Sequence, residues 1–148
     1  MFASEKEMSK EFEKFIKKEF GNSYFKEQEG LFGVPDFILA DRKSNLIISF
    51  ELKLKNWKRA AIQAFRYKSF SDISYVVLPS TNINSKEFSI EYFKKFNIGL
   101  AEFNLEQGFR IISKPQKGTP YSNKLNDKAT TIIKSNRKRV KNIEFLIG

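Results

Sequence analysis

The sequence of 148 residues contains no cysteine and no histidine. The missing thiols exclude disulfides, thiolate nucleophiles and zinc sites built on cysteine. The missing imidazoles exclude Ser-His-Asp triads and every reaction that needs a histidine base. Catalysis by this chain must therefore use carboxylates, lysines, hydroxyl groups or a hard metal ion, and the oxygen ligands of Asp and Glu suit Mg²⁺ or Mn²⁺.

Long apolar runs are also missing. No stretch approaches the roughly 18 apolar residues of a membrane span, and the start "MFASEKEMSKEFEK" is too charged for a signal peptide. We therefore expect a soluble, cytoplasmic protein with no membrane partner. The 41% of apolar residues, which include 15% aromatic residues, are enough for a folded core.

The net charge of +10 is unevenly distributed. Residues 1–109 hold 17 Lys and Arg against 15 Asp and Glu, whereas residues 110–148 hold 10 against 2, so the last segment contributes +8. This asymmetry favours a polyanionic partner such as nucleic acid. The alternative is a lysine-rich surface that only keeps the protein soluble.

Helical and strand patterns alternate along the chain. Ser4 is a suitable helix N-cap, and Met8, Phe12 and Ile16 follow at helical spacing. The expected elements are a helix over 4–20, strands over 23–28, 36–41 and 46–55, a helix over 56–69, a strand over 73–79, a helix over 86–96, and strands near 98–103 and 109–113. This order, α-β-β-β-α-β-α-β-β, predicts an α/β fold with a mixed central sheet flanked by helices.

Residues 1–114 are expected to form the main domain and residues 115–148 a basic C-terminal extension. The stretch from about Lys114 to Asn126 is rich in Pro, Gly, Ser and Lys, which predicts irregular structure, and a short helix could follow. The basic tail "KSNRKRVK" could hold a DNA backbone through Lys134, Arg137, Lys138, Arg139 and Lys141. The alternative is a disordered, solvated end.

Carboxylates interrupt two apolar runs in "VPDFILADRKSNLIISFELKLK", residues 34–55. Alternation places Leu46, Ile48, Phe50, Leu52 and Leu54 on a core face, and Ile47, Ser49, Glu51, Lys53 and Lys55 on the other. A hairpin that pairs Asp41 with Leu46 would also place Asp36 opposite Glu51. Two carboxylates that close repel unless a cation lies between them, which favours a metal site. A salt-bridge cluster with Lys53 on a solvated sheet face is the alternative.

Pro35-Asp36, fourteen intervening residues and Glu51-Leu52-Lys53 resemble the signature of the PD-(D/E)XK nuclease superfamily, in which the motif lies on a hairpin between two helices. The resemblance covers about residues 4–103 and implies a restriction-endonuclease-like core of the resolvase-like branch within residues 1–114. It implies that Asp36, Glu51 and the backbone carbonyl of Leu52 hold Mg²⁺, with Mn²⁺ able to substitute. It also implies that Lys53 positions or helps to deprotonate a water molecule.

Further positions resemble the same superfamily. Gln63 and Tyr67 lie four residues apart on the second helix, as in members related to the resolvases, and they share a face with Arg59 and Arg66 nearby. The alternative is an ordinary surface Gln beside a semi-buried Tyr. A glutamate on the first helix is also expected near the metal, and Glu5 heads the buried stripe. The alternative is that Glu5 only complements the helix dipole. Lys55, Arg59 and Arg66 are candidates for contacts with nucleic acid.

These features predict a Mg²⁺-dependent endonuclease that cuts double-stranded or branched DNA, of the restriction, junction-resolving or mobile-element type. Many nucleases of this kind act as dimers, because two strands need two active sites, so a homodimer is a further expectation. An RNA-directed nuclease and a non-catalytic nucleic-acid-binding module of the same fold are the alternatives.

Overall fold

A computed structural model describes residues 1–41, 43–134 and 140–148 of the chain. In chain order its elements are α1 (Glu5–Phe20), β1 (Tyr24–Lys26), β2 (Phe37–Asp41), β3 (Leu46–Leu52), α2 (Trp57–Tyr67), β4 (Ile73–Leu78), α3 (Ser80–Ile83), α4 (Ile90–Lys95), β5 (Gly99–Asn104), β6 (Gly108–Ser113), α5 (Asn123–Ile133) and the 3-10 helix η1 (Ile143–Leu146). The strands form one sheet in the order β1-β2-β3-β4-β5-β6. Since β3–β4 and β4–β5 are parallel and the other pairs antiparallel, the expected mixed α/β fold is confirmed.

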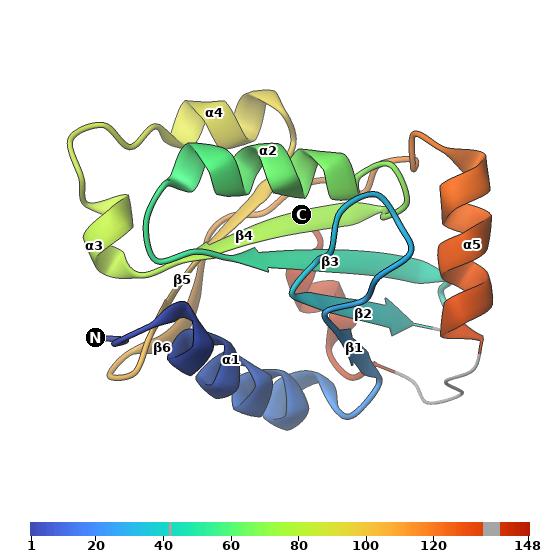
Figure 1. The fold of residues 1–148 in the computed structure, drawn as a ribbon, viewed down its shortest axis with the longest axis horizontal. Helices are drawn as coiled ribbons and strands as arrows, with labels where there is room; N and C mark the ends of the chain where they lie inside the picture. The colour runs from blue at the N-terminus through green and yellow to red at the C-terminus, as the bar shows by residue number, and fades with distance from the viewer. Residues whose placement is uncertain (42, 135–139) are drawn as a thin grey trace.

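Helices cover both faces of this sheet (Figure 1). The helix α1 buries Met8, Phe12, Ile16 and Phe20 against one face, where the ring of Phe12 lies 5.4–5.5 Å from those of Phe37 and Phe50. On the other face, α2 buries three alanines that allow close approach to the sheet. The sheet is therefore the central layer of the fold.

The strand β3 is buried on both faces, unlike the half-solvated strand that its alternating pattern suggested. The reason is that α2 covers the face that carries Ile47, Ser49 and Glu51, and Ile47 packs there with Phe70 and Ala129. A salt-bridge cluster on a solvated sheet face is excluded, because Glu51 is 5% exposed. The predicted pairing of Asp41 with Leu46 is confirmed.

Some predicted boundaries were wrong. The helix expected over residues 86–96 is reduced to α4, which begins at Ile90, and the separate short helix α3 follows Pro79. The strand predicted to reach Lys55 ends at Leu52, although the N–H of Lys53 still donates to the carbonyl oxygen of Val77 at 3.1 Å. None of the described helices has the length and apolar character needed to cross a membrane.

The C-terminal extension packs on the core. The helix α5 begins earlier than expected, because the Oγ of Ser122 caps it by accepting a hydrogen bond from the N–H of Leu125 at 3.1 Å. Beyond it, Val140, Ile143 and Leu146 join the core on the α1 face. A disordered, solvated end is therefore wrong for these residues. Lys134 and Lys141 are exposed, and Arg137, Lys138 and Arg139 lie outside the described residues.

Candidate active site

Asp36 lies immediately before β2, where the ladder between β2 and β3 ends. The last pair of that ladder is Phe37 with Phe50, one position short of the predicted pair of Asp36 with Glu51. The N–H of Asp36 donates to the carbonyl oxygen of Phe50 at 3.0 Å. Its carboxylate Oδ2 accepts the N–H of Leu52 at 2.7 Å. Two backbone contacts thus fix the Asp36 side chain over the end of β3.

Glu51 lies near the same end of β3, on the face of the sheet that α2 covers. Its Oε1 accepts a hydrogen bond from the hydroxyl of Tyr67 at 2.6 Å, and the same hydroxyl lies 3.1 Å from the carbonyl oxygen of Val34. Tyr67 is 2% exposed and belongs to the last turn of α2. Through Tyr67, α2 therefore orients the carboxylate of Glu51.

Both carboxyl groups have raised pKa values. Burial, followed by repulsion from Asp36, raises the pKa of Glu51 from 4.5 to about 8, against the opposing effects of the Tyr67 hydrogen bond and of Lys53. Burial also raises the pKa of Asp36 from 3.8 to about 6, against the hydrogen bond from Leu52. A site that holds two carboxyls in this way favours protons or a cation between them.

Lys53 and Glu5 act on both of these carboxyl groups. The charge of Lys53 lowers the pKa of Asp36 and of Glu51, whereas the charge of Glu5 raises both. Glu5 is exposed in the first turn of α1, and its Oε1 accepts the N–H of Leu54 at 3.3 Å. The fold thus brings all four predicted charged residues to one end of β3.

The other predicted residues Gln63, Arg59 and Arg66 lie on α2, the helix that supplies Tyr67. Gln63 lies one turn before Tyr67, and its amide Oε1 is buried without a hydrogen-bond partner in the described chain. A buried amide oxygen without a partner costs about 1–3 kcal/mol, which marks a position where a ligand can supply a donor. Arg59 and Arg66 are exposed on the same helix.

A cleft of about 630 Å³ lies beyond the carboxyl ends of β3 and β4, and Lys55 is the one predicted site residue among the described residues that line it. One wall is the segment from Leu54 to Lys58, and Pro79 and Asn82 contribute to another. Lys55 is predicted to contact nucleic acid, and Lys58, which was not among the predicted site residues, lines the same cleft. Ligands of open α/β sheets commonly bind outside the carboxyl ends of strands.

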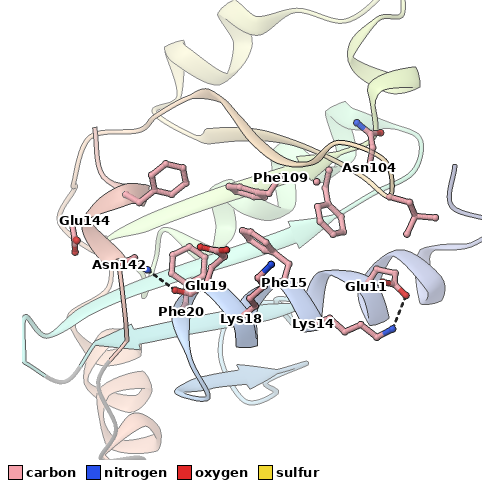
Figure 2. Close-up of a pocket in the computed structure, with 14 residues that line it drawn as sticks. Glu11, Lys14, Phe15, Lys18, Glu19, Phe20, Asn104, Phe109, Asn142 and Glu144 are labelled. Atoms are coloured by element: carbon pink, nitrogen blue, oxygen red, sulfur yellow. Dashed lines mark hydrogen bonds and ion pairs between the residues drawn. The ribbon is translucent and has the colours of Figure 1, made fainter.

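A larger cavity of about 830 Å³ lies elsewhere, between α1, β6 and the C-terminal segment (Figure 2). Phenylalanines and charged side chains both line it, and the rings of Phe15 and Phe109 stack there at 4.6 Å. Its carboxylate Glu11 pairs with Lys14 at 3.1 Å. None of the predicted site residues lines this cavity, so its size does not make it the catalytic centre.

The donor set at Asp36 and Glu51 fits a hard divalent cation. Within the described ranges, Asp36 Oδ1 and Glu51 Oε2 accept no hydrogen bond, so one oxygen of each carboxylate is available. The same ranges contain no cluster of three or more acidic side chains that could hold a metal ion. Further ligands would have to be the Leu52 carbonyl oxygen and water, which Mg²⁺ commonly retains.

Comparisons with known proteins give no family. No protein-family profile and no curated protein matches the chain. A solved structure of a protein of unknown function from Silicibacter pomeroyi is similar to it, with a TM-score of 0.44 and 19% identity over 76% of this chain and 75% of that one. A likeness of this extent supports no inference about function.

Proposed function

We propose that this protein is a Mg²⁺-dependent endonuclease with a restriction-endonuclease-like core of the PD-(D/E)XK type, and that it hydrolyses phosphodiester bonds of DNA. The observation that carries the proposal is the pair Asp36 and Glu51, two carboxyl groups held at one strand end with raised pKa values and with Lys53 as the neighbouring cation. Burial of two like charges costs free energy, and a bound cation would offset that cost.

The residues of the chain have separable roles in this proposal. A divalent cation held by Asp36, Glu51 and the Leu52 carbonyl would supply Lewis-acid activation of water and neutralisation of charge on the scissile phosphate. Lys53 orients the attacking water and stabilises developing negative charge. Tyr67 holds Glu51 in place, and its hydroxyl is engaged by Glu51 and Val34, so it acts as a positioning residue. The buried Oε1 of Gln63 is suited to accept a hydrogen bond from Lys53 or from water.

The DNA would approach through the cleft beside β3 and β4. Lys55 and Lys58 line it, and Arg59 and Arg66 are exposed on α2. Contacts of these side chains with phosphates would give salt-dependent binding that is largely independent of sequence. A homodimer that presents two such sites to the two strands remains part of the proposal.

Cleavage assays on plasmid and branched DNA, with Mg²⁺, Mn²⁺ or EDTA, test this function. Wild-type protein should cut with either metal and not with EDTA, and Asp36→Asn or Lys53→Ala should lower the rate by about 100-fold or more. Glu11→Gln and Lys14→Ala are matched controls, because they remove the same charges from the cavity of Figure 2. Unchanged cleavage by the Asp36 and Lys53 variants, or no cleavage by the wild type, would show that the assignment is wrong.

A further inference from the structure

The loop over residues 27–35 holds an exposed phenylalanine near the candidate active site. Phe32 is 50% exposed, and its neighbour Val34 is 47% exposed. A single exposed apolar side chain is ordinary on a protein surface. Two further observations concern Phe32: the backbone beside it contacts the site residue Tyr67, and its ring has an arginine as neighbour, whereas the exposed rings of Phe65, Tyr121 and Phe145 lie near lysines.

The loop is attached to the active site through Tyr67. The hydroxyl of Tyr67 contacts both the carbonyl oxygen of Val34 and the carboxylate of Glu51. Gly33 has φ +82°, and a Cβ at this position would lie 2.9 Å from Cε1 of the Tyr67 ring. The backbone therefore passes against Tyr67 at a distance that only glycine allows. Phe32 directly precedes this Gly33, so its backbone continues from a segment that is packed against Tyr67.

Arg66 lies next to Phe32. Its guanidinium carbon is 5.7 Å from the centroid of the Phe32 ring, and Arg66 precedes Tyr67 on α2. An exposed aromatic ring with an arginine is a combination that binds nucleobases, since the ring stacks on a base and the guanidinium stacks or contacts a phosphate. The ring and the cation come from two elements that Tyr67 joins.

We propose that Phe32 and Arg66 form a stacking platform that receives an unpaired base of the DNA strand that is cut. The proposal rests on the proposed nuclease function and deepens it by naming a substrate class. A base inside a duplex is already stacked on both sides, so it presents no free face to Phe32. The favoured substrate is therefore DNA with unpaired nucleotides beside the scissile phosphate, such as a duplex with a single-stranded arm.

Binding to a defined probe tests the platform without cleavage. The probe is a DNA hairpin with a single-stranded arm that carries 2-aminopurine at its junction, and the comparison is the same hairpin without the arm, both in EDTA. Wild-type protein should quench the 2-aminopurine fluorescence by stacking. Phe32→Ala should abolish the quenching and weaken binding of the armed hairpin by about 5- to 150-fold, the range expected for one stacked base. Binding of the armless hairpin should change less than about twofold.

Two variants serve as controls. Phe32→Trp keeps an aromatic face and should retain quenching, whereas Phe145→Ala removes a ring of similar exposure, 48%, from η1 and should behave as the wild type. The platform is wrong if Phe32→Ala binds and quenches like the wild type, or if Phe145→Ala shows the same loss. Cleavage of the armed hairpin with Mg²⁺ is measured separately. If the wild type cuts the armed hairpin but Phe32→Ala binds and quenches like the wild type, the platform alone is overturned. If quenching depends on Phe32 but the wild type does not cut, the platform is supported and the nuclease function is overturned.

Discussion

Replacing Glu51 by glutamine should stabilise the metal-free protein in alkaline solution. The pKa of Glu51 is about 8 in the folded protein, against an ordinary value of 4.5, so between these values the folded state binds more protons than the unfolded state. The free energy of unfolding must then fall as the pH rises through this window, because the folded protein has to bury a charge. Each unit of difference between these two pKa values corresponds to about 1.36 kcal/mol. Ionisation of Glu51 can therefore lower the free energy of unfolding by at most about 5 kcal/mol.

Glu51→Gln removes this charge and keeps an oxygen that can accept the Tyr67 hydrogen bond. At about pH 9 the variant should exceed the wild type by about 2–5 kcal/mol in free energy of unfolding, and at about pH 4 the two should agree within about 1 kcal/mol. In the variant, the free energy of unfolding should still fall with rising pH while Asp36 ionises, because the pKa of Asp36 is raised to about 6. This fall should end once the pH exceeds that value.

Urea unfolding in EDTA, followed by fluorescence of Trp57, measures these free energies, because Trp57 is the one tryptophan and is 7% exposed. Glu102→Gln is the matched control: it also removes a buried carboxylate, which pairs with Arg110 at 3.2 Å, but leaves Glu51 in place. Its stability should fall with pH as that of the wild type does. Parallel curves for wild type and Glu51→Gln would refute the reasoning.

Two other substitutions test the geometry of the site. Tyr67→Phe removes the hydrogen bond to Glu51, so it should destabilise the protein by about 1–3 kcal/mol, raise the pKa of Glu51 and move the rise of a pH–rate profile to higher pH. Tyr75→Phe, which loses a bond to the carbonyl oxygen of Leu146 at 2.8 Å, should leave that profile in place. Gly33→Ala should lower the free energy of unfolding by about 1–3 kcal/mol, more than Gly108→Ala, since at Gly108 (φ +73°) a Cβ meets nothing within 4 Å. Equal losses in urea unfolding would show that contact with Tyr67 is unimportant.

The sequence predicted those parts of the fold that local chemistry determines. Ser4 caps its helix as expected, and alternating apolar residues with a short turn determined the register of the β2–β3 hairpin. The burial of both faces of β3 was not predictable from its alternation, because it depends on α2 and α5, which follow later in the chain. The start of α5 was missed because proline and glycine before it outweighed the cap at Ser122.

For the candidate site, the pattern identified residues that the fold brings to one strand end, but not the contacts that hold them. Strand alternation placed Glu51 and Lys53 on one face, and helical spacing placed Gln63 and Tyr67 one turn apart. The bond from the Leu52 N–H to Asp36 and the contact of Gly33 with Tyr67 depend on where the loop 27–35 crosses α2. Sequence spacing carries no such information.

Diffraction from crystals of the protein soaked with Mn²⁺ is the most direct test of the central claim. The account predicts an anomalous peak between the carboxylates of Asp36 and Glu51, in reach of the Leu52 carbonyl oxygen, that is absent from crystals of Asp36→Asn. Soaked wild-type crystals with well-ordered Asp36 and Glu51 side chains and no peak between them would contradict the metal site.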